Sequence, residues 1–100
     1  LTSVITPVTR PGNGHVWHQY TVRLPGRDRD AAVRQLADRG VGTGVFYPVP
    51  AHRQDYLHEV AAGVSLPVTE RLAGEVFSLP VHPQLSQAEL ETIVAEVNRL

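Results

Sequence analysis

Side chains that can bind a polar ligand are concentrated between residues 47 and 56. This stretch carries two phenols, an imidazole, a guanidinium and an amide, which belong to Tyr47, His52, Arg53, Gln54 and Tyr56. Two prolines restrict the backbone between them, so the polar groups would lose little conformational freedom on binding. Arg53 could pair with a phosphate, and His52 would share a face with Tyr56 if the stretch were helical. The spacing fits a ligand-binding segment and a solvent-exposed connector equally well.

The five histidines of the chain do not form a metal-binding pattern. His15 and His18 are three residues apart in a predicted strand, so their side chains should lie on opposite faces. His52 and His58 are six residues apart, a spacing that does not bring two side chains together on a helix. The chain has no cysteine, which removes thiolate ligands and cysteine nucleophiles. We therefore predict no metal site.

All nine basic residues are arginines, and the chain contains no lysine. It therefore cannot form a side-chain Schiff base with an aldehyde cofactor. Gly40, Gly42 and Gly44 resemble a phosphate-binding loop, but they follow a predicted helix instead of opening one. We interpret them as a helix C-cap that leads into a strand. No catalytic residue and no cofactor-binding residue is expected in this chain.

Length and charge narrow the possible classes of protein. One hundred residues suit one small domain, and 42% of them are hydrophobic, which favours a folded core. A net charge of −1 does not provide the positive field that nucleic acids or anionic membranes require. The sequence contains no apolar run long enough to span a membrane, and residues 1–14 lack the features of a signal peptide. Together with the absence of cysteine, these features predict a cytoplasmic protein.

The elements that would position these side chains follow from periodicity and capping. Residues 1–14 are rich in proline and glycine and are expected to form a lead-in without regular structure. Alternation predicts a strand over 15–24, and we expect its Trp17 to be covered by the lead-in or by another copy of the chain. A helix is predicted over 29–39, with Asp28 as its N-cap and Gly40 just beyond its end. The remaining predictions are a strand at 41–47, a short helix or turn at 52–60, a helix at 67–73 and a strand at 76–81.

The last helix has the clearest signals. Ser86 and Glu89 are spaced as a capping box. Its predicted buried face consists of Leu90, Ile93, Val94, Val97 and Leu100. This element order predicts an α/β fold in which helices cover a small mixed three-stranded sheet. The unit over 15–47 should be a right-handed crossover with two parallel strands, and the third strand should be antiparallel to them.

An ordered set of motifs gives the chain a family resemblance. The motifs are His15-Val-Trp-His18-Gln-Tyr20-Thr-Val-Arg23, Gly40-Val-Gly-Thr43, Tyr47-Pro-x-Pro50-x-His52-x-Gln54-x-Tyr56, Pro67 with Glu70-Arg-Leu72-Ala, and Leu79-Pro80-Val-His-Pro83-x-Leu85-Ser86. From His15 to Leu100 the chain resembles the C-terminal domain of the DegT/DnrJ/StrS sugar aminotransferases, which are pyridoxal-phosphate enzymes of fold type I.

This resemblance implies a role in amino-sugar biosynthesis. The family transfers an amino group, usually from glutamate, to a keto sugar attached to a nucleotide. It holds pyridoxal phosphate on a lysine of a large N-terminal domain, which agrees with the absence of lysine here. The chain would then be a small domain over 15–100, preceded by the lead-in over 1–14. It would be inactive by itself and would contact its own large domain in a homodimeric parent enzyme.

The resemblance also nominates site residues. Tyr47, His52 and Gln54 are candidate contacts to the nucleotide sugar or to the structure around it. Phe46 stands where many relatives have a polar histidine or tyrosine, so no polar substrate contact is expected at that position.

A second hypothesis is a free-standing binding or regulatory module on the same fold. The chain begins with Leu1 and stops on the apolar face of a helix, which favours excision from a longer protein. An upstream stretch with an aspartate for the pyridine nitrogen and a Schiff-base lysine would confirm the aminotransferase hypothesis.

Overall fold

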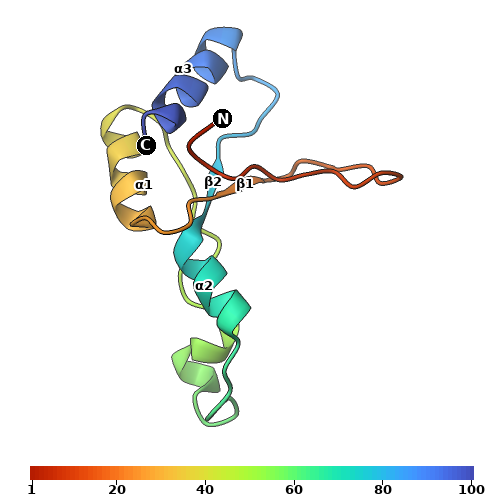
Figure 1. The fold of residues 1–100 in the computed structure, drawn as a ribbon, viewed down its shortest axis with the longest axis vertical. Helices are drawn as coiled ribbons and strands as arrows, with labels where there is room; N and C mark the ends of the chain where they lie inside the picture. Colours follow the sequence, from red (N-terminus) through yellow and green to blue (C-terminus); the bar gives the residue numbers. More distant parts are fainter.

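The computed structural model describes residues 1–100 and has three helices and two strands (Figure 1). The elements are β1 (Tyr20–Arg23), α1 (Arg29–Asp38), α2 (Pro67–Glu75), β2 (Val76–Leu79) and α3 (Gln87–Asn98). Two short 3₁₀ turns, η1 (Ala51–Arg53) and η2 (Asp55–Leu57), lie between α1 and α2. None of the helices is both long enough and apolar enough to cross a membrane.

The sheet consists of β1 and β2, which pair antiparallel from Tyr20 opposite Leu79 to Arg23 opposite Val76. Single bridges extend it on each side, at Ile5 beside Arg23 and at Gly44 beside Ser78. The fold is therefore mixed α/β, and β2 is antiparallel to β1 as predicted, but the strand predicted over 41–47 does not form. Gly42 and Gly44 offer no side chains to pack on a sheet, so this stretch contributes a single bridge to β2. Because that bridge is antiparallel to β2, the stretch runs parallel to β1, in the direction that the sequence predicted.

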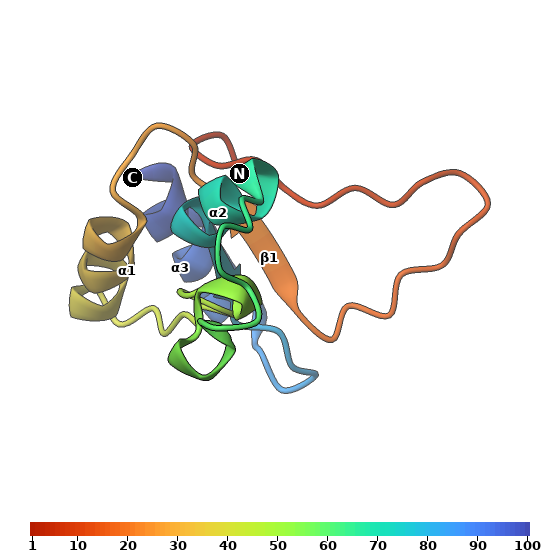
Figure 2. The same cartoon turned by 90° about the horizontal axis from the view of Figure 1, so that it is seen from below.

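The strand predicted over 15–24 is also shorter than expected. Trp17 has a φ of 48°, in the left-handed region, which a strand does not accommodate. Residues 6–19 leave the body of the molecule and return to it as a long loop (Figure 2). Within this loop Trp17 stacks between His15 and Tyr20 and remains partly exposed. Its burial against another copy of the chain stays a prediction.

A core of nine buried apolar residues lies between the sheet, α1, and the C-terminal end of α3. Phe77 and Val22 of the sheet and Leu36 of α1 are completely buried. The N-terminus joins this core, because Val4 is buried and the Thr2 amide donates to Asn98 Oδ1 at 2.8 Å. Residues 1–5 are thus packed on the body, although residues 1–14 contain no helix or strand.

The helix capping predictions are confirmed. Asp28 accepts a hydrogen bond from the Ala31 amide, and Ser86 and Glu89 form a capping box. The predicted buried face of α3 is partly wrong, because Leu90 and Val94 are 42% and 43% exposed. Val97 is fully buried, and Ile93 and Leu100 pack against the core. Only the second half of α3 therefore packs against the core, while its first half extends away from it (Figure 1).

Candidate functional site

The segment predicted to bind a ligand, residues 47–56, lies in a part of the molecule that projects from the core together with α2 (Figure 1). None of the apolar residues from 42 to 74 is buried. Pro50 adopts an extended conformation and precedes η1, which ends at Arg53, and η2 follows at Asp55. The prolines interrupt regular structure, so the segment forms two tight turns instead of one helix.

The three candidate residues have different surroundings. Tyr47 is 72% exposed, so its phenol is available to a ligand. Gln54 donates from Nε2 to the Val49 carbonyl at 3.1 Å, which closes the turn around Pro50 and leaves the amide oxygen of Gln54 without a hydrogen bond. His52 is the opposite of Tyr47, because only 8% of its side chain is exposed. His52 and Gln54 line one hollow of about 340 Å³ that Tyr47 does not reach, so the structure brings together two of the three candidates.

The carboxylate of Glu70, in the first turn of α2, organises the surroundings of His52. Its Oε1 atom accepts hydrogen bonds from His52 Nε2 at 2.8 Å, from Arg53 Nη2 at 3.1 Å and from the Leu66 amide at 3.0 Å. These donors hold the pKa of Glu70 at about 2, with the hydrogen bond from His52 as the largest cause. The carboxylate is therefore ionised at neutral pH. We call this group of four residues the Glu70 cluster.

Nothing in the sequence pattern indicated a role for Glu70. Its position is one of those that carry the family resemblance, and a carboxylate in a first turn is favourable for any helix. Its partners are 17 and 18 residues away along the chain, a separation that periodicity does not connect.

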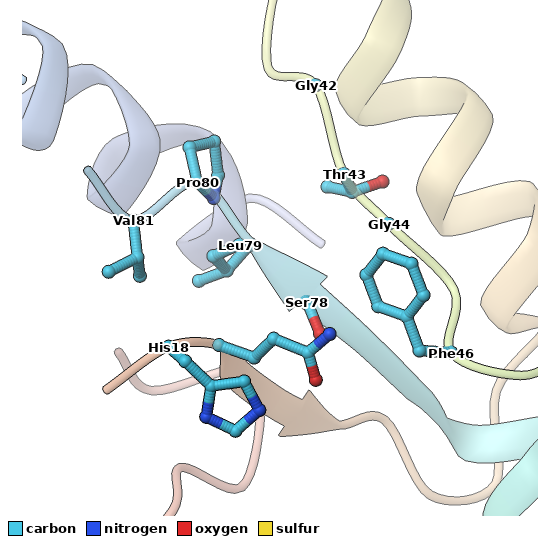
Figure 3. Close-up of a pocket in the computed structure, with 10 residues that line it drawn as sticks. His18, Gly42, Thr43, Gly44, Phe46, Ser78, Leu79, Pro80 and Val81 are labelled. Carbon is cyan, nitrogen blue, oxygen red and sulfur yellow. The ribbon is translucent and has the colours of Figure 1, made fainter. Parts of the chain in front are cut away.

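An apolar hollow of about 320 Å³ separates the segment from α2. Phe46, Tyr47 and Val49 line one side of it, and Thr69, Leu72 and Ala73 of α2 line the other. A second hollow, of about 420 Å³, lies at the sheet and is lined by His18, Gln19, Gly42, Thr43, Gly44, Phe46, Ser78, Leu79, Pro80 and Val81 (Figure 3). Phe46 lines both hollows.

The second hollow contains no carboxylate and no guanidinium. Its polar groups are an imidazole, an amide and hydroxyls, and the Thr43 hydroxyl is buried without a hydrogen-bond partner. The ring of Phe46 lies directly over Gly44 (Figure 3), where a Cβ atom would be 2.5 Å from Phe46 Cε2. Such a lining suits an uncharged, hydroxyl-bearing group with one apolar face better than it suits an ion.

The histidines and carboxylates do not gather elsewhere. The structure contains no group of three or more such side chains that could hold a metal ion. His15 stacks on Trp17, and His52 binds Glu70.

Comparison with known proteins identifies what this arrangement is similar to. The model of the DegT/DnrJ/EryC1/StrS aminotransferase family matches residues 1–98. The dTDP-3-amino-3,6-dideoxy-alpha-D-galactopyranose transaminase of Aneurinibacillus thermoaerophilus is 37% identical over 93 residues, which are 93% of this chain and 25% of that protein. The dTDP-3-amino-3,4,6-trideoxy-alpha-D-glucose transaminase of Micromonospora megalomicea subsp. nigra is 40% identical over 96 residues, which are 94% of this chain and 25% of that protein.

A solved structure shares the fold as well. The S. venezuelae DesV protein in complex with a ketimine intermediate superposes with a TM-score of 0.87 and 35% identity, over 97% of this chain and 26% of that one. This chain therefore spans about a quarter of the length of the relatives that it matches.

Proposed function

The chain belongs to the DegT/DnrJ/EryC1/StrS aminotransferase family, and we propose that it is the C-terminal small domain of an aminotransferase that acts on a nucleotide-linked keto sugar. The observation that carries this proposal is the match of the family model to 98 of the 100 residues. The printed activities of two relatives, both of which are dTDP-linked amino-sugar transaminases, support the same substrate class.

The proposed domain covers residues 15–100, and the lead-in over 1–14 connects it to the rest of the enzyme. The packing of Val4 and the bridge between Ile5 and Arg23 would anchor the start of this lead-in on the domain. The partner of this domain is then its own large N-terminal domain, in an enzyme that we expect to be a cytoplasmic homodimer. A nucleic-acid or membrane partner is not part of the proposal, because the net charge is −1.

Pyridoxal phosphate is the cofactor that the family implies, and this chain does not provide the group that would hold it covalently. A Schiff base needs a lysine, and all nine basic residues are arginines. We therefore assign the binding of the cofactor to the remainder of the enzyme, and we assign no catalytic step to residues of this chain.

The contribution of this chain would be to border the sugar and its nucleotide. Tyr47 can donate a hydrogen bond from its exposed phenol, and Gln54 can accept one on its free amide oxygen. Phe46, which is 49% exposed, offers an apolar ring to a ligand and no polar contact. His52 belongs to the structure around the ligand, because both of its ring nitrogens are covered.

The test is an assay of the enzyme that contains this chain, with a nucleotide-linked keto sugar as acceptor and glutamate as donor. We expect the amino sugar as product, and Tyr47→Phe should raise KM for the nucleotide sugar by about 2- to 12-fold, the loss of one neutral hydrogen bond. Absence of transamination, or a gene that encodes only this module, would favour the free-standing binding or regulatory alternative.

The chain itself can be tested with the cofactor. Incubation with pyridoxal phosphate and borohydride should trap no side-chain adduct, because no lysine is present. Labelling of the α-amino group serves as the internal control. A stoichiometric side-chain adduct would contradict the assignment of the cofactor to the rest of the enzyme.

A further inference from the structure

We propose that Glu70 is a positioning residue for the ligand-binding segment and that it acts through His52, which itself does not contact the substrate. This inference rests on the proposed function, because it explains how the segment that carries Tyr47 and Gln54 is held in place. It goes beyond that function by separating the residues that contact the nucleotide sugar from those that orient the contacts.

The first support is the number of links between the segment and α2. Hydrogen bonds to the Glu70 carboxylate from His52 and Arg53 are the only ones that join residues 45–62 to α2. No backbone hydrogen bond crosses between these parts, and no apolar residue between 42 and 74 is buried. Every hydrogen bond between η1 and α2 therefore ends on one carboxylate oxygen, Oε1 of Glu70.

The second support is the state in which Glu70 holds the imidazole. An ionised carboxylate can only accept hydrogen bonds, so His52 Nε2 must carry the proton that it donates to Oε1. The other ring nitrogen, Nδ1, is buried and has no hydrogen-bond partner. In this arrangement neither nitrogen of His52 is free to bind a ligand, so the residue is in place to support its neighbours.

The third support is the place of His52 in the segment. It lies in η1, and η1 begins directly after Pro50. Gln54 follows η1 and donates a hydrogen bond back to the Val49 carbonyl. A displacement of His52 would therefore move the turn that carries Gln54 and the backbone that leads to it from Tyr47. Arg53 and His52 are the charged or titratable groups that face the carboxylate.

A spectroscopic experiment tests the link between Glu70 and His52 independently of any substrate. In the ¹⁵N-labelled chain, ¹⁵N chemical shifts of the His52 ring should report a proton on Nε2 as the dominant neutral form. Glu70→Ala should remove the hydrogen bond from His52 Nε2 and so shift the His52 ring signals. Glu59→Ala, which removes another exposed carboxylate of the same region, is the control and should leave them unchanged. An unshifted His52 spectrum in Glu70→Ala would overturn the proposal.

A double-mutant cycle in the whole enzyme tests the positioning role. Glu70→Ala and His52→Ala should each raise KM for the nucleotide sugar by roughly 10-fold, and the double variant should raise it no further, as for two residues of one interacting pair. The KM for the amino donor should not change. Glu70→Gln keeps an acceptor oxygen without the charge and should raise KM for the nucleotide sugar by less. This variant keeps the test decisive if the alanine variant does not fold.

The outcomes separate this inference from the proposed function. Additive effects of the two substitutions, or a rise for His52→Ala without one for Glu70→Ala, would show that His52 contacts the substrate directly and would overturn the inference. If the enzyme used no nucleotide-linked keto sugar, the proposed function would fail, and the His52 spectrum would still decide whether Glu70 holds the imidazole.

Discussion

The two ends of this molecule are stabilised in different ways. At one end the sheet, α1, and the last turns of α3 enclose nine buried apolar side chains. At the other end, residues 46–74 contain no buried apolar residue, and Tyr47, Tyr56 and Val68 are exposed. There, hydrogen bonds to Glu70 from His52, Arg53 and the Leu66 amide link the turns to α2.

The difference teaches where the function of such a domain can reside. Buried apolar area supplies most of the free energy of folding, so the core end can fold and carry the other end. The projecting end has little buried surface to lose when its turns shift, and it presents polar and aromatic groups to the outside. Binding segments are commonly placed in this way, on irregular stretches that a rigid scaffold positions.

The largest expected effect comes from opening the core. Phe77→Ala removes the largest fully buried side chain and should lower the free energy of unfolding by about 3–5 kcal/mol, measured by urea denaturation. Val68→Ala, at an exposed position of the projecting end, is the matched control and should change it by less than about 0.5 kcal/mol. Equal losses for both variants would mean that the two ends share one core.

Helix capping provides the second comparison. Ser86→Ala should cost about 1 kcal/mol of unfolding free energy, because the Ser86 hydroxyl caps α3 and its hydrogen bonds with Glu89 lower the pKa of that carboxyl. The N-cap of α2 is Leu66, which has no side-chain cap and is bonded through its amide to Glu70 instead. Leu66→Ala leaves that amide in place and should therefore cost less than Ser86→Ala. The reverse order would contradict this assignment of the two caps.

Acid should change the NMR signals of the Glu70 cluster before it changes those of the core. The pKa of Glu70 is lowered from 4.5 to about 2 in the folded chain, so its stabilising contribution is complete above pH 4.5. That contribution is lost as the pH falls from 4.5 towards 2, because the carboxyl then becomes protonated. NMR signals of His52 and Leu66 should follow this titration, whereas Phe77 should not respond until the whole domain unfolds. Glu70→Gln should abolish the step, and a step that persisted in this variant would assign it to another group.

The smallest expected effect concerns the packing of Phe46. Gly44→Ala places a methyl group 2.5 Å from the Phe46 ring, and the half-exposed ring can rotate away. The cost in unfolding free energy should therefore be less than about 1 kcal/mol, while the ring shifts and the hollow beside it changes shape. Ring nuclear Overhauser effects report the movement.

Gly74→Ala is the matched control, because nothing lies within 4 Å of the added carbon in α2. It should stabilise the chain by about 0.5–1 kcal/mol. If Gly44→Ala lowered the free energy of unfolding by several kcal/mol, Phe46 would be held rigidly and the projecting end would have a core of its own.

The predictions from the sequence were most accurate where the determining contacts are local. Asp28 and Ser86 bond to amides three residues away, so capping can be read directly from spacing. Pro67 begins α2 as its fixed φ angle requires, and Gly40 follows α1 with a φ of 82°. The order of the motifs was likewise a property of the sequence alone, and it was sufficient to identify the family.

Only the tertiary structure decided the sheet and the site. The pairing of β1 with β2 joins residues more than fifty positions apart, and the register leaves one position, Gly44, for the stretch that the sequence predicted as a strand. The Glu70 cluster joins residues 17 and 18 positions apart, and α3 turns Leu90 away from the core although its periodicity matches a buried face. Periodicity shows which side chains share a face of an element, but which face is covered depends on the packing of elements that are distant in the chain.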